Sequence, residues 1–570
     1  MKRRPGLWLA LTAFVAGASM LGLAGCGSSS GGSSGASGGS AGSQAIPAHQ
    51  DGGTITTALN GNIDYLDPAL AYYQASWQIE YSTCVKLTNY KDEPGDEGRV
   101  IYPEAASSLP EISSDGLTYT YTVPPGKFKF NTGEDVTAES FQYALERDLN
   151  PKQASYFGSF FLSPYIKGAA DFKGKPGEHV SGIQVQGDKL IISLTQKDGG
   201  LISKLTTPFA CAVTKDTPID SKGVHAPAGA GPYYISSYTP NRSIVLKKNP
   251  NYTGDRPAYA DEIDYTQLTI DQNQGTLETK NGQLDYAGSD VVVPAQNFQL
   301  NKEFGEGGTA GGSQRFFITP AAVISYLALN TVRDTFSNEK VRQAVNWAIN
   351  RKEILQPSGY GAGIPTDKYL PPQFPAAGFE ESIYPLDSAD IDKAKQLMQE
   401  SGVQTPLTAV LYTCNSQPCP DRAAIIQQEL KPIGINVQIK EFDRGVQFTK
   451  EGTKGEPFDI ADEGWIADYY DAYDFLNVLL DGSNIPETGG NNFSFFNDAT
   501  FNQRMQDANQ LTGEERDKTY GQIATDIAKG PAPWASRSTG TNIDFFSERI
   551  GCQVNQGSYG FALNTFCIRS

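Results

Sequence analysis

The densest group of side chains capable of chemistry lies between Gly464 and Phe475. Carboxylates and aromatic rings alternate there: Trp465, Asp468, Tyr469, Tyr470, Asp471 and Tyr473. A carboxylate in a site that excludes water binds a cation, because an unpaired charge away from water is very costly. The faces of Trp465 and Tyr469 can add cation–π attraction. This stretch therefore predicts a binding site for a positively charged group.

Asp468 also has a purely structural interpretation, as the N-cap of the next helix. The residue types alone favour that role. Asp471 is better placed for it, because it directly precedes the run Ala472–Leu480, and Asp474 follows Asp471 at the spacing of a capping box. If Asp471 caps the helix, Asp468 is free to bind.

Motifs for covalent or metal-assisted catalysis are missing from the sequence. The chain has three histidines, and His49 follows a Ser/Gly-rich tract, which leaves His179 and His225 for a catalytic triad. Neither a Gly-x-Ser-x-Gly nor a His-Glu-x-x-His motif occurs. Paired glycosidase carboxylates leave no motif, so a secreted hydrolase is an alternative. We expect a binding protein that is not an enzyme and needs no cofactor.

The first residues have the parts of an export signal. Three basic residues at positions 2–4 precede an apolar run at 7–23, which ends in Leu23-Ala24-Gly25-Cys26 before a Ser/Gly tract. This ending looks like a lipobox, in which the Cys26 thiol is alkylated and the signal at 1–25 is removed. An uncleaved membrane anchor is the alternative, but the run is at the lower limit for a span. We expect a lipid-anchored protein on the extracytoplasmic face of the cell membrane, with a tether at 26–51.

The remaining cysteines suggest disulfides. Setting Cys26 aside leaves six of the seven, an even number in an exported chain. Many connectivities are open to six cysteines, but two pairs are close in sequence and the third follows by elimination: Cys414–Cys419, Cys552–Cys567 and Cys84–Cys211. Metal binding is the alternative. The Cys414-x4-Cys419 pair has no second cluster and no nearby histidine, so we expect no metal.

Size and charge limit the partners. The chain has 570 residues and a formal net charge of −18, which falls to about −21 once the basic signal is removed. Such an acidic body is a poor partner for nucleic acid or an anionic membrane surface. A mature chain of about 545 residues exceeds one hydrophobic core and implies two or more lobes. We expect a monomer.

Hydrophobic periodicity predicts a mixed α/β protein. Strands are expected at 53–59, 117–123, 189–194, 243–247 and 325–330, and helices at 137–149, 341–349 and 390–400. A strand at 407–412, a helix at 422–431 and a strand at 435–439 form a β-α-β pattern. Such units build a partly parallel sheet with covering helices.

Several segments occur together in one order: Leu66-Asp67-Pro68, 115–121 with 128–131 and 137–147, 229–233 with 246–250, 341–355, and Gly464-Trp465-Ile466-Ala467-Asp468-Tyr469. Each is weak alone, but in this order behind a lipobox they resemble family 5 solute-binding proteins of ABC importers, the oligopeptide- and dipeptide-binding group. The chain departs from the family pattern at Pro124 and Ala472, outside the expected ligand contacts.

The resemblance implies a two-lobed periplasmic-binding-protein fold, type II-like, whose lobes are joined by crossing strands and close over ligand. Lobe 1 would comprise 52–317 and 536–570, with an inserted small domain at about 76–180. Lobe 2 would comprise 318–535. The implied partners are a short peptide and the transmembrane subunits of an ABC permease with cytoplasmic ATPases. The alternatives are an oligosaccharide or nickel-chelate ligand, or a peptide-sensing receptor.

The same resemblance assigns the site. Asp468 would pair with the terminal ammonium of the ligand, and the backbone of Trp465, Ile466 and Ala467 can hydrogen-bond a peptide as an added strand. From lobe 1, Asn62 and Ile63 would face the ligand, although this segment also reads as an ordinary turn. The carboxylate of the ligand needs a cation. Arg315 and Arg444 are candidates, and nothing in the sequence selects either of them.

Overall fold

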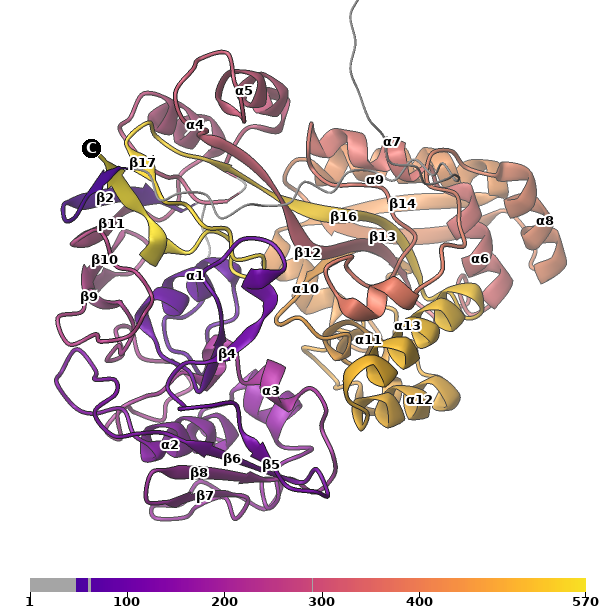
Figure 1. Cartoon of the computed structure of the whole chain (residues 1–570). Helices are drawn as coiled ribbons and strands as arrows, with labels where there is room; N and C mark the ends of the chain where they lie inside the picture. The colour runs from indigo at the N-terminus through magenta and orange to yellow at the C-terminus, as the bar shows by residue number, and fades with distance from the viewer. Residues whose placement is uncertain (1–47, 60–62, 290) are drawn as a thin grey trace, which may run out of the picture. The chain divides into compact units, whose positions relative to one another are not determined.

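Two long antiparallel strands run through the computed structural model, which describes residues 48–59, 63–289 and 291–570 (Figure 1). They are β12 (Phe316–Leu329) and β16 (Trp534–Phe545). One end of the pair packs in a core with Phe316 and Phe545, and the other end packs in a second core with Leu327 and Ala535. The predicted lobe boundaries at 317/318 and 535/536 therefore fall inside these strands.

The second half of the chain contains a five-stranded sheet in the order β14-β13-β15-β12-β16. Its other members are β13 (Leu407–Cys414), β14 (Ile435–Phe442) and β15 (Ile460–Ile466). β13 and β14 are parallel and are connected by α9 (Cys419–Leu430), which confirms the predicted β-α-β unit.

Helices cover this sheet with apolar residues. In α6 (Glu339–Ala348) the predicted stripe of Val341, Val345 and Ala348 is fully buried, together with residues of α8 (Ile391–Ser401). Gly402 ends α8 in the left-handed region, where a side chain would be strained. The other helices of this half are α7 (Arg351–Leu355), α10 (Arg444–Glu451), α11 (Tyr473–Leu480), α12 (Ala499–Asn509) and α13 (Gly513–Lys529).

The first half is organised around a four-stranded sheet in the order β2-β11-β10-β9. Its strands are β2 (Thr54–Ala58), β9 (Tyr233–Thr239), β10 (Ser243–Lys248) and β11 (Glu262–Gln267). Residues from the end of the chain, such as Phe546, Phe561 and Phe566, complete its core. Nearby elements are α1 (Gln74–Thr83), α4 (Gln272–Lys280), α5 (Asn297–Phe304), β1 (His49–Gln50), β17 (Ile550–Gly551) and β18 (Cys567–Arg569).

A smaller sheet has the order β5-β6-β8-β7. It consists of β5 (Glu111–Ile112), β6 (Thr118–Thr122), β7 (Ile183–Gln186) and β8 (Lys189–Ser193), with α2 (Ala138–Leu149) beside it. Thr137 precedes α2 as predicted, and its N–H donates to the hydroxyl of Ser140. The sheet ends at Ser193, beyond the predicted end of the small domain at about 180, because β7 and β8 complete it. The first half of the chain also contains three short elements: β3 (Thr88–Tyr90), β4 (Ile101–Pro103) and α3 (Leu201–Lys204).

Three disulfides have the predicted pairing: Cys84–Cys211, Cys414–Cys419 and Cys552–Cys567. The last pair lies near His49, but sulfurs bonded to each other are not thiolate ligands for a metal. Cys26 and the predicted signal and tether fall outside the described residues, apart from the last few residues of the tether. Among the described helices, none is both long and apolar enough to cross a membrane.

Candidate functional site

Asp468 lies just beyond the end of β15, and its side chain is buried. The hydroxyl of Tyr72, from the first half of the chain, donates a 2.9 Å hydrogen bond to Oδ2 of Asp468. Tyr72 follows a turn organised by Asp64, whose Oδ2 accepts the Tyr72 N–H at 2.7 Å. The two halves of the chain therefore meet at Asp468.

A second carboxylate lies against the first. Oδ2 of Asp474 accepts the backbone N–H of Asp468 at 2.9 Å and the indole N–H of Trp465 at 3.3 Å. Within the described residues, Oδ1 of Asp474 has no hydrogen-bond partner, and neither carboxylate forms an ion pair. This pair concentrates negative charge in a place that excludes water.

The pKa values reflect this environment. Burial raises the pKa of Asp468 to about 7, although the hydrogen bond from Tyr72 lowers it. Burial and the charge of Asp468 raise the pKa of Asp474 well above its usual range. Both shifts arise because a negative charge is poorly solvated here, so a cation next to Asp468 would stabilise its ionised form.

The predicted capping arrangement is wrong in its details. Helix α11 begins at Tyr473, and Ala472 occupies the N-cap position without a side-chain hydrogen bond. Asp471 accepts the Tyr473 N–H at 2.8 Å, but its carboxylate is mainly committed to buried Arg516, at 2.7 Å. Asp474 turns toward Trp465 and does not close a capping box. Asp468 is free of helix capping, as the second interpretation expected.

Aromatic rings form the wall around Tyr72. The ring centroids of Tyr156, Trp77, Phe209 and Trp465 lie between 5.3 and 6.4 Å from that of Tyr72. A cavity of about 30 Å³ is lined by Tyr156, Phe160 and residues between 478 and 492. This volume suits a molecule the size of water. A larger ligand at Asp468 requires Tyr72 and Asp468 to separate first.

The other predicted site residues differ in exposure. Trp465 is half-buried, Ile466 is 41% exposed, and Ala467 is buried with its N–H bonded to the carbonyl oxygen of Ala322. Tyr469 is 1% exposed and packs against the ring of Phe161, so its side chain belongs to the packed core. Ile63 packs on the core beneath the β2 sheet, and Asn62 lies outside the described residues.

One edge of β15 is open near this site. β12 pairs with β15 along its whole length, whereas β13 pairs only with Ile460 and Ala461. Beyond Ala461 the edge facing β13 has no strand partner in the described part of the chain. Because Ala467 bonds to β12, the alternate residues Gly464 and Ile466 direct their backbone polar groups to the open edge.

Comparison with known proteins identifies the fold and the family. The model of bacterial extracellular solute-binding proteins, family 5, matches residues 100–487, more than half of the chain. The chain belongs to this family. The expected class of solute-binding protein is therefore confirmed.

Relatives and solved structures agree with this assignment. Heme-binding protein A of Haemophilus influenzae is 27% identical over 86% of each chain, and the oligopeptide-binding protein OppA of Bacillus subtilis is 25% identical over 81% of this chain and 83% of its own. Haemophilus influenzae OppA, solved with RPPGFSPFR, superposes with a TM-score of 0.72 at 19% identity, covering 92% of this chain and 100% of its own. The solute-binding protein thus has the two-lobed fold of periplasmic binding proteins, and its relatives are named for binding.

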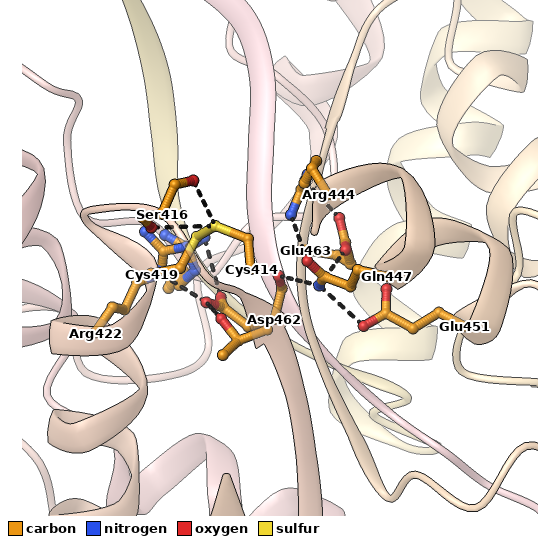
Figure 2. Close-up of a disulfide and its surroundings, with 11 residues drawn as sticks. Cys414, Ser416, Cys419, Arg422, Arg444, Gln447, Glu451, Asp462 and Glu463 are labelled. Atoms are coloured by element: carbon orange, nitrogen blue, oxygen red, sulfur yellow. Dashed lines mark hydrogen bonds and ion pairs between the residues drawn. A yellow bond between two sulfur atoms is a disulfide. The ribbon is translucent and has the colours of Figure 1, made fainter. Parts of the chain in front are cut away.

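Neither predicted arginine is free for the ligand carboxylate in this family 5 protein. The guanidinium of Arg315 donates to the carbonyl oxygens of Phe546 and Thr279. Arg444 forms an ion pair with Glu463 at 2.8 Å (Figure 2). Tyr72 and Asp474 are partners of Asp468 that the sequence did not predict. The Tyr72-Tyr73 pair after Leu66-Asp67-Pro68 is visible in the sequence, but no local spacing connects it to Asp468.

Proposed function

We propose that this protein is a lipid-anchored receptor that captures short peptides between its two lobes and delivers them to an ABC import permease. The family assignment and the peptide-binding relatives support the class of ligand. The lipobox at Cys26 supports the anchor, after removal of 1–25, and residues 26–51 would serve as the tether. The lobes would correspond to 52–317 with 536–570, and 318–535.

The observation that carries the proposal is the buried carboxylate of Asp468, which has no cation partner among the described residues. A peptide brings an ammonium group at its N-terminus. When the lobes open, Tyr72 leaves Asp468 and the ammonium takes its place. On closure the ammonium neutralises Asp468, whose charge is otherwise poorly solvated.

The open edge of β15 would provide a second set of contacts with the ligand, through backbone hydrogen bonds. An extended peptide can pair with Gly464 and Ile466 through its backbone, which gives affinity without reading side chains. Trp465 and Ile466 would contact the ligand beside this edge, together with Ala467 and Tyr469 of the same segment. Asn62 and Ile63 would approach from the other lobe.

Binding alone would complete the role of this protein, which breaks no bond in the ligand. Ligand would stabilise the closed form and thereby shift the population of open and closed lobes. A neutral oligosaccharide would leave Asp468 uncompensated, so the carboxylate favours a ligand with an amino group. A peptide-sensing receptor would use the same site, and deleting the permease genes would distinguish it, because a response would persist without import.

The test compares ligands and variants by isothermal titration calorimetry. We expect trialanine to bind and N-acetyl-trialanine to bind at least about 100-fold more weakly, because acetylation removes the ammonium. Asp468→Asn should abolish the preference for the free amine. The control is Glu487→Gln, at a carboxylate that is mostly exposed and paired with Lys454. Equal affinity for both ligands in the wild type would refute the assigned role of Asp468.

A further inference from the structure

Asp474 is a second carboxylate beside the proposed ammonium site. It lies in the first turn of α11 and is fully buried. Its Oδ2 accepts the backbone N–H of Asp468 at 2.9 Å and the indole N–H of Trp465 at 3.3 Å. Its Oδ1 has no hydrogen-bond partner within the described residues, where Asp474 also forms no ion pair. A single ammonium group at Asp468 therefore leaves a buried carboxyl group without a cation.

Several neighbours of Asp474 stabilise its ionised form. The two N–H groups that donate to Oδ2 lower the pKa of Asp474, and the start of a helix stabilises a carboxylate in the first turn. Burial and the charge of Asp468 act more strongly in the opposite direction and raise that pKa well above its usual range. Asp471 also raises it, although Asp471 is itself paired with Arg516. The proton on Asp474 therefore takes the place of a cation that the described chain does not provide.

Asp468 and Asp474 act as one pair of carboxyl groups. Burial raises the pKa of Asp468, whereas hydrogen bonds with Tyr72 and with the carboxyl group of Asp474 lower it. Two buried carboxyl groups in contact share a proton, because two like charges at this distance cannot both be ionised without a cation. The state with Asp468 ionised and Asp474 protonated matches a ligand with one positive charge. A ligand with two positive charges can replace the proton as well.

Aromatic rings surround this pair. Burial and the nearby carboxyl groups, Asp474 among them, raise the pKa values of Tyr72, Tyr156 and Tyr469 well above the usual value, so these phenols keep their protons. The ring centroid of Tyr72 lies 5.3 Å from that of Tyr156 and 6.4 Å from that of Trp465. Such rings can hold the apolar stem of a lysine or arginine side chain and attract its charged end. The environment of Asp474 thus suits a cation on an apolar stem.

The contact between Asp474 and Asp468 determines which residue of a peptide would carry the second charge. Because Asp474 accepts the backbone N–H of Asp468 itself, a cation at Asp474 lies close to the ammonium group at Asp468. Successive side chains of an extended peptide point to opposite sides. The side chain of the first residue begins at the carbon atom that bears the α-ammonium group, so this side chain is the one that can reach Asp474.

We propose that Asp474 binds the basic side chain of the first residue of the ligand, so that the protein selects peptides that begin with lysine or arginine. The inference rests on the proposed function and adds a residue that determines specificity at the same site. When the basic side chain binds, its positive charge replaces the proton of Asp474, which is released to the solvent. A peptide with a neutral first residue binds more weakly, with Asp474 still protonated.

The experiment compares Lys-Ala-Ala with norleucine-Ala-Ala, whose first side chain is apolar and of similar length, by isothermal titration calorimetry at neutral pH. We expect the lysine peptide to bind about 30-fold or more tightly. Arg-Ala-Ala should have a similar advantage, whereas Ala-Lys-Ala should bind no better than trialanine. Titrations in buffers of different ionisation enthalpy should detect about one more proton released with the lysine peptide than with the norleucine peptide.

Variants separate the charge of Asp474 from its structural role. Asp474→Asn keeps an oxygen that can accept the two N–H groups, and it should bring the two affinities together and abolish the additional proton release. Asp474→Glu should retain part of the preference. Asp526→Asn is the matched control, because Asp526 pairs with Arg504 in a partly exposed position. If Asp474→Asn weakened both peptides equally and left proton release unchanged, Asp474 would only position Asp468, and the inference would be overturned.

The wild-type protein alone also decides the question. Equal affinity for the lysine and norleucine peptides would overturn the inference, even if neither variant at Asp474 folded. If acetylation of the N-terminus still weakened binding in that case, the proposed function would stand. If none of these tripeptides bound, both the inference and the proposed function would be overturned.

Discussion

The hydroxyl of Tyr72 lies 2.9 Å from Oδ2 of Asp468, although 396 residues separate the two in the chain. This contact joins the first half of the chain to the segment after β15. Both groups are removed from bulk water, and burial and the charge of Asp468 raise the pKa of Tyr72 well above its usual value. Tyr72 therefore keeps its proton and donates it to the ionised carboxylate of Asp468.

Stability should depend on pH through Asp468. Its pKa of about 7 in the folded protein exceeds the unperturbed value of 3.8, so the folded state binds more protons than the unfolded state between these values. The free energy of unfolding should therefore fall as pH rises from about 4 to 7, by up to ~4 kcal/mol from this group. Urea denaturation at several pH values measures this slope. Asp468→Asn should have a shallower slope, and an unchanged slope would contradict the shift.

Peptide affinity should have the opposite dependence. The ammonium of the ligand needs an ionised carboxylate, and below pH 7 the unliganded protein must first release a proton from Asp468. Affinity should therefore rise by up to about tenfold per pH unit up to neutral pH and then level off. Calorimetry in buffers of different ionisation enthalpy should also detect proton release. Constant affinity between pH 5 and 8 would be inconsistent with this model.

Tyr72→Phe removes the donor to Asp468. Because this hydrogen bond lowers the pKa of Asp468, its loss should move the midpoint of the affinity–pH curve upward. The substitution should also reduce the stability of the unliganded protein by about 1–3 kcal/mol. Tyr73→Phe is the control, since Tyr73 is 41% exposed. If both variants shifted the curve equally, the contact between Tyr72 and Asp468 would not be the cause.

Lys204 and Asp198 form an ion pair that is fully buried, at 2.8 Å. The ammonium of Lys204 also lies 3.8 Å from the ring centroid of Tyr473, in the opposite half of the chain. Lys204→Met should destabilise the protein by ~3–5 kcal/mol because it leaves a buried carboxylate unpaired. The double variant Lys204→Met with Asp198→Asn should recover part of this loss. Thermal unfolding measures both, and a double variant less stable than the single one would argue against the explanation.

The disulfides should differ in their contribution. Cys84–Cys211 spans 127 residues and Cys414–Cys419 spans 5. In the chain-entropy model, the longer loop is worth about 5 kcal/mol and the shorter about 2 kcal/mol. Serine pairs at each disulfide, compared by denaturant unfolding, should rank in this order. A larger loss from the short loop would indicate that local packing dominates.

The elements that the sequence predicts well are those with local periodicity. The stripe of Val341 and Val345 defines α6, and the alternation at 407–412 and 435–439 defines β13 and β14. β12 is longer than predicted, because Pro320 and the irregular register around it conceal the start of the strand at Phe316.

The candidate site likewise has features that the sequence predicts and features that it does not. The family motif predicts that Asp468 is a site residue. The position of Asp471, directly before the next helix, predicts that Asp468 does not cap that helix. The contact with Tyr72 depends on packing between distant segments. No local pattern encodes this arrangement.

The pairing of β12 with β16 restricts how the lobes can move. Sliding one strand past the other would break many ladder hydrogen bonds at once, so a shearing motion is costly. The register is interrupted twice, between Ala321 and Ile324 and between Ser325 and Tyr326, and bending at these places disturbs few bonds. If the lobes open as proposed, the strand pair would bend at these two interruptions and keep its register elsewhere, so each closure would return Asp468 to the same position beside Tyr72.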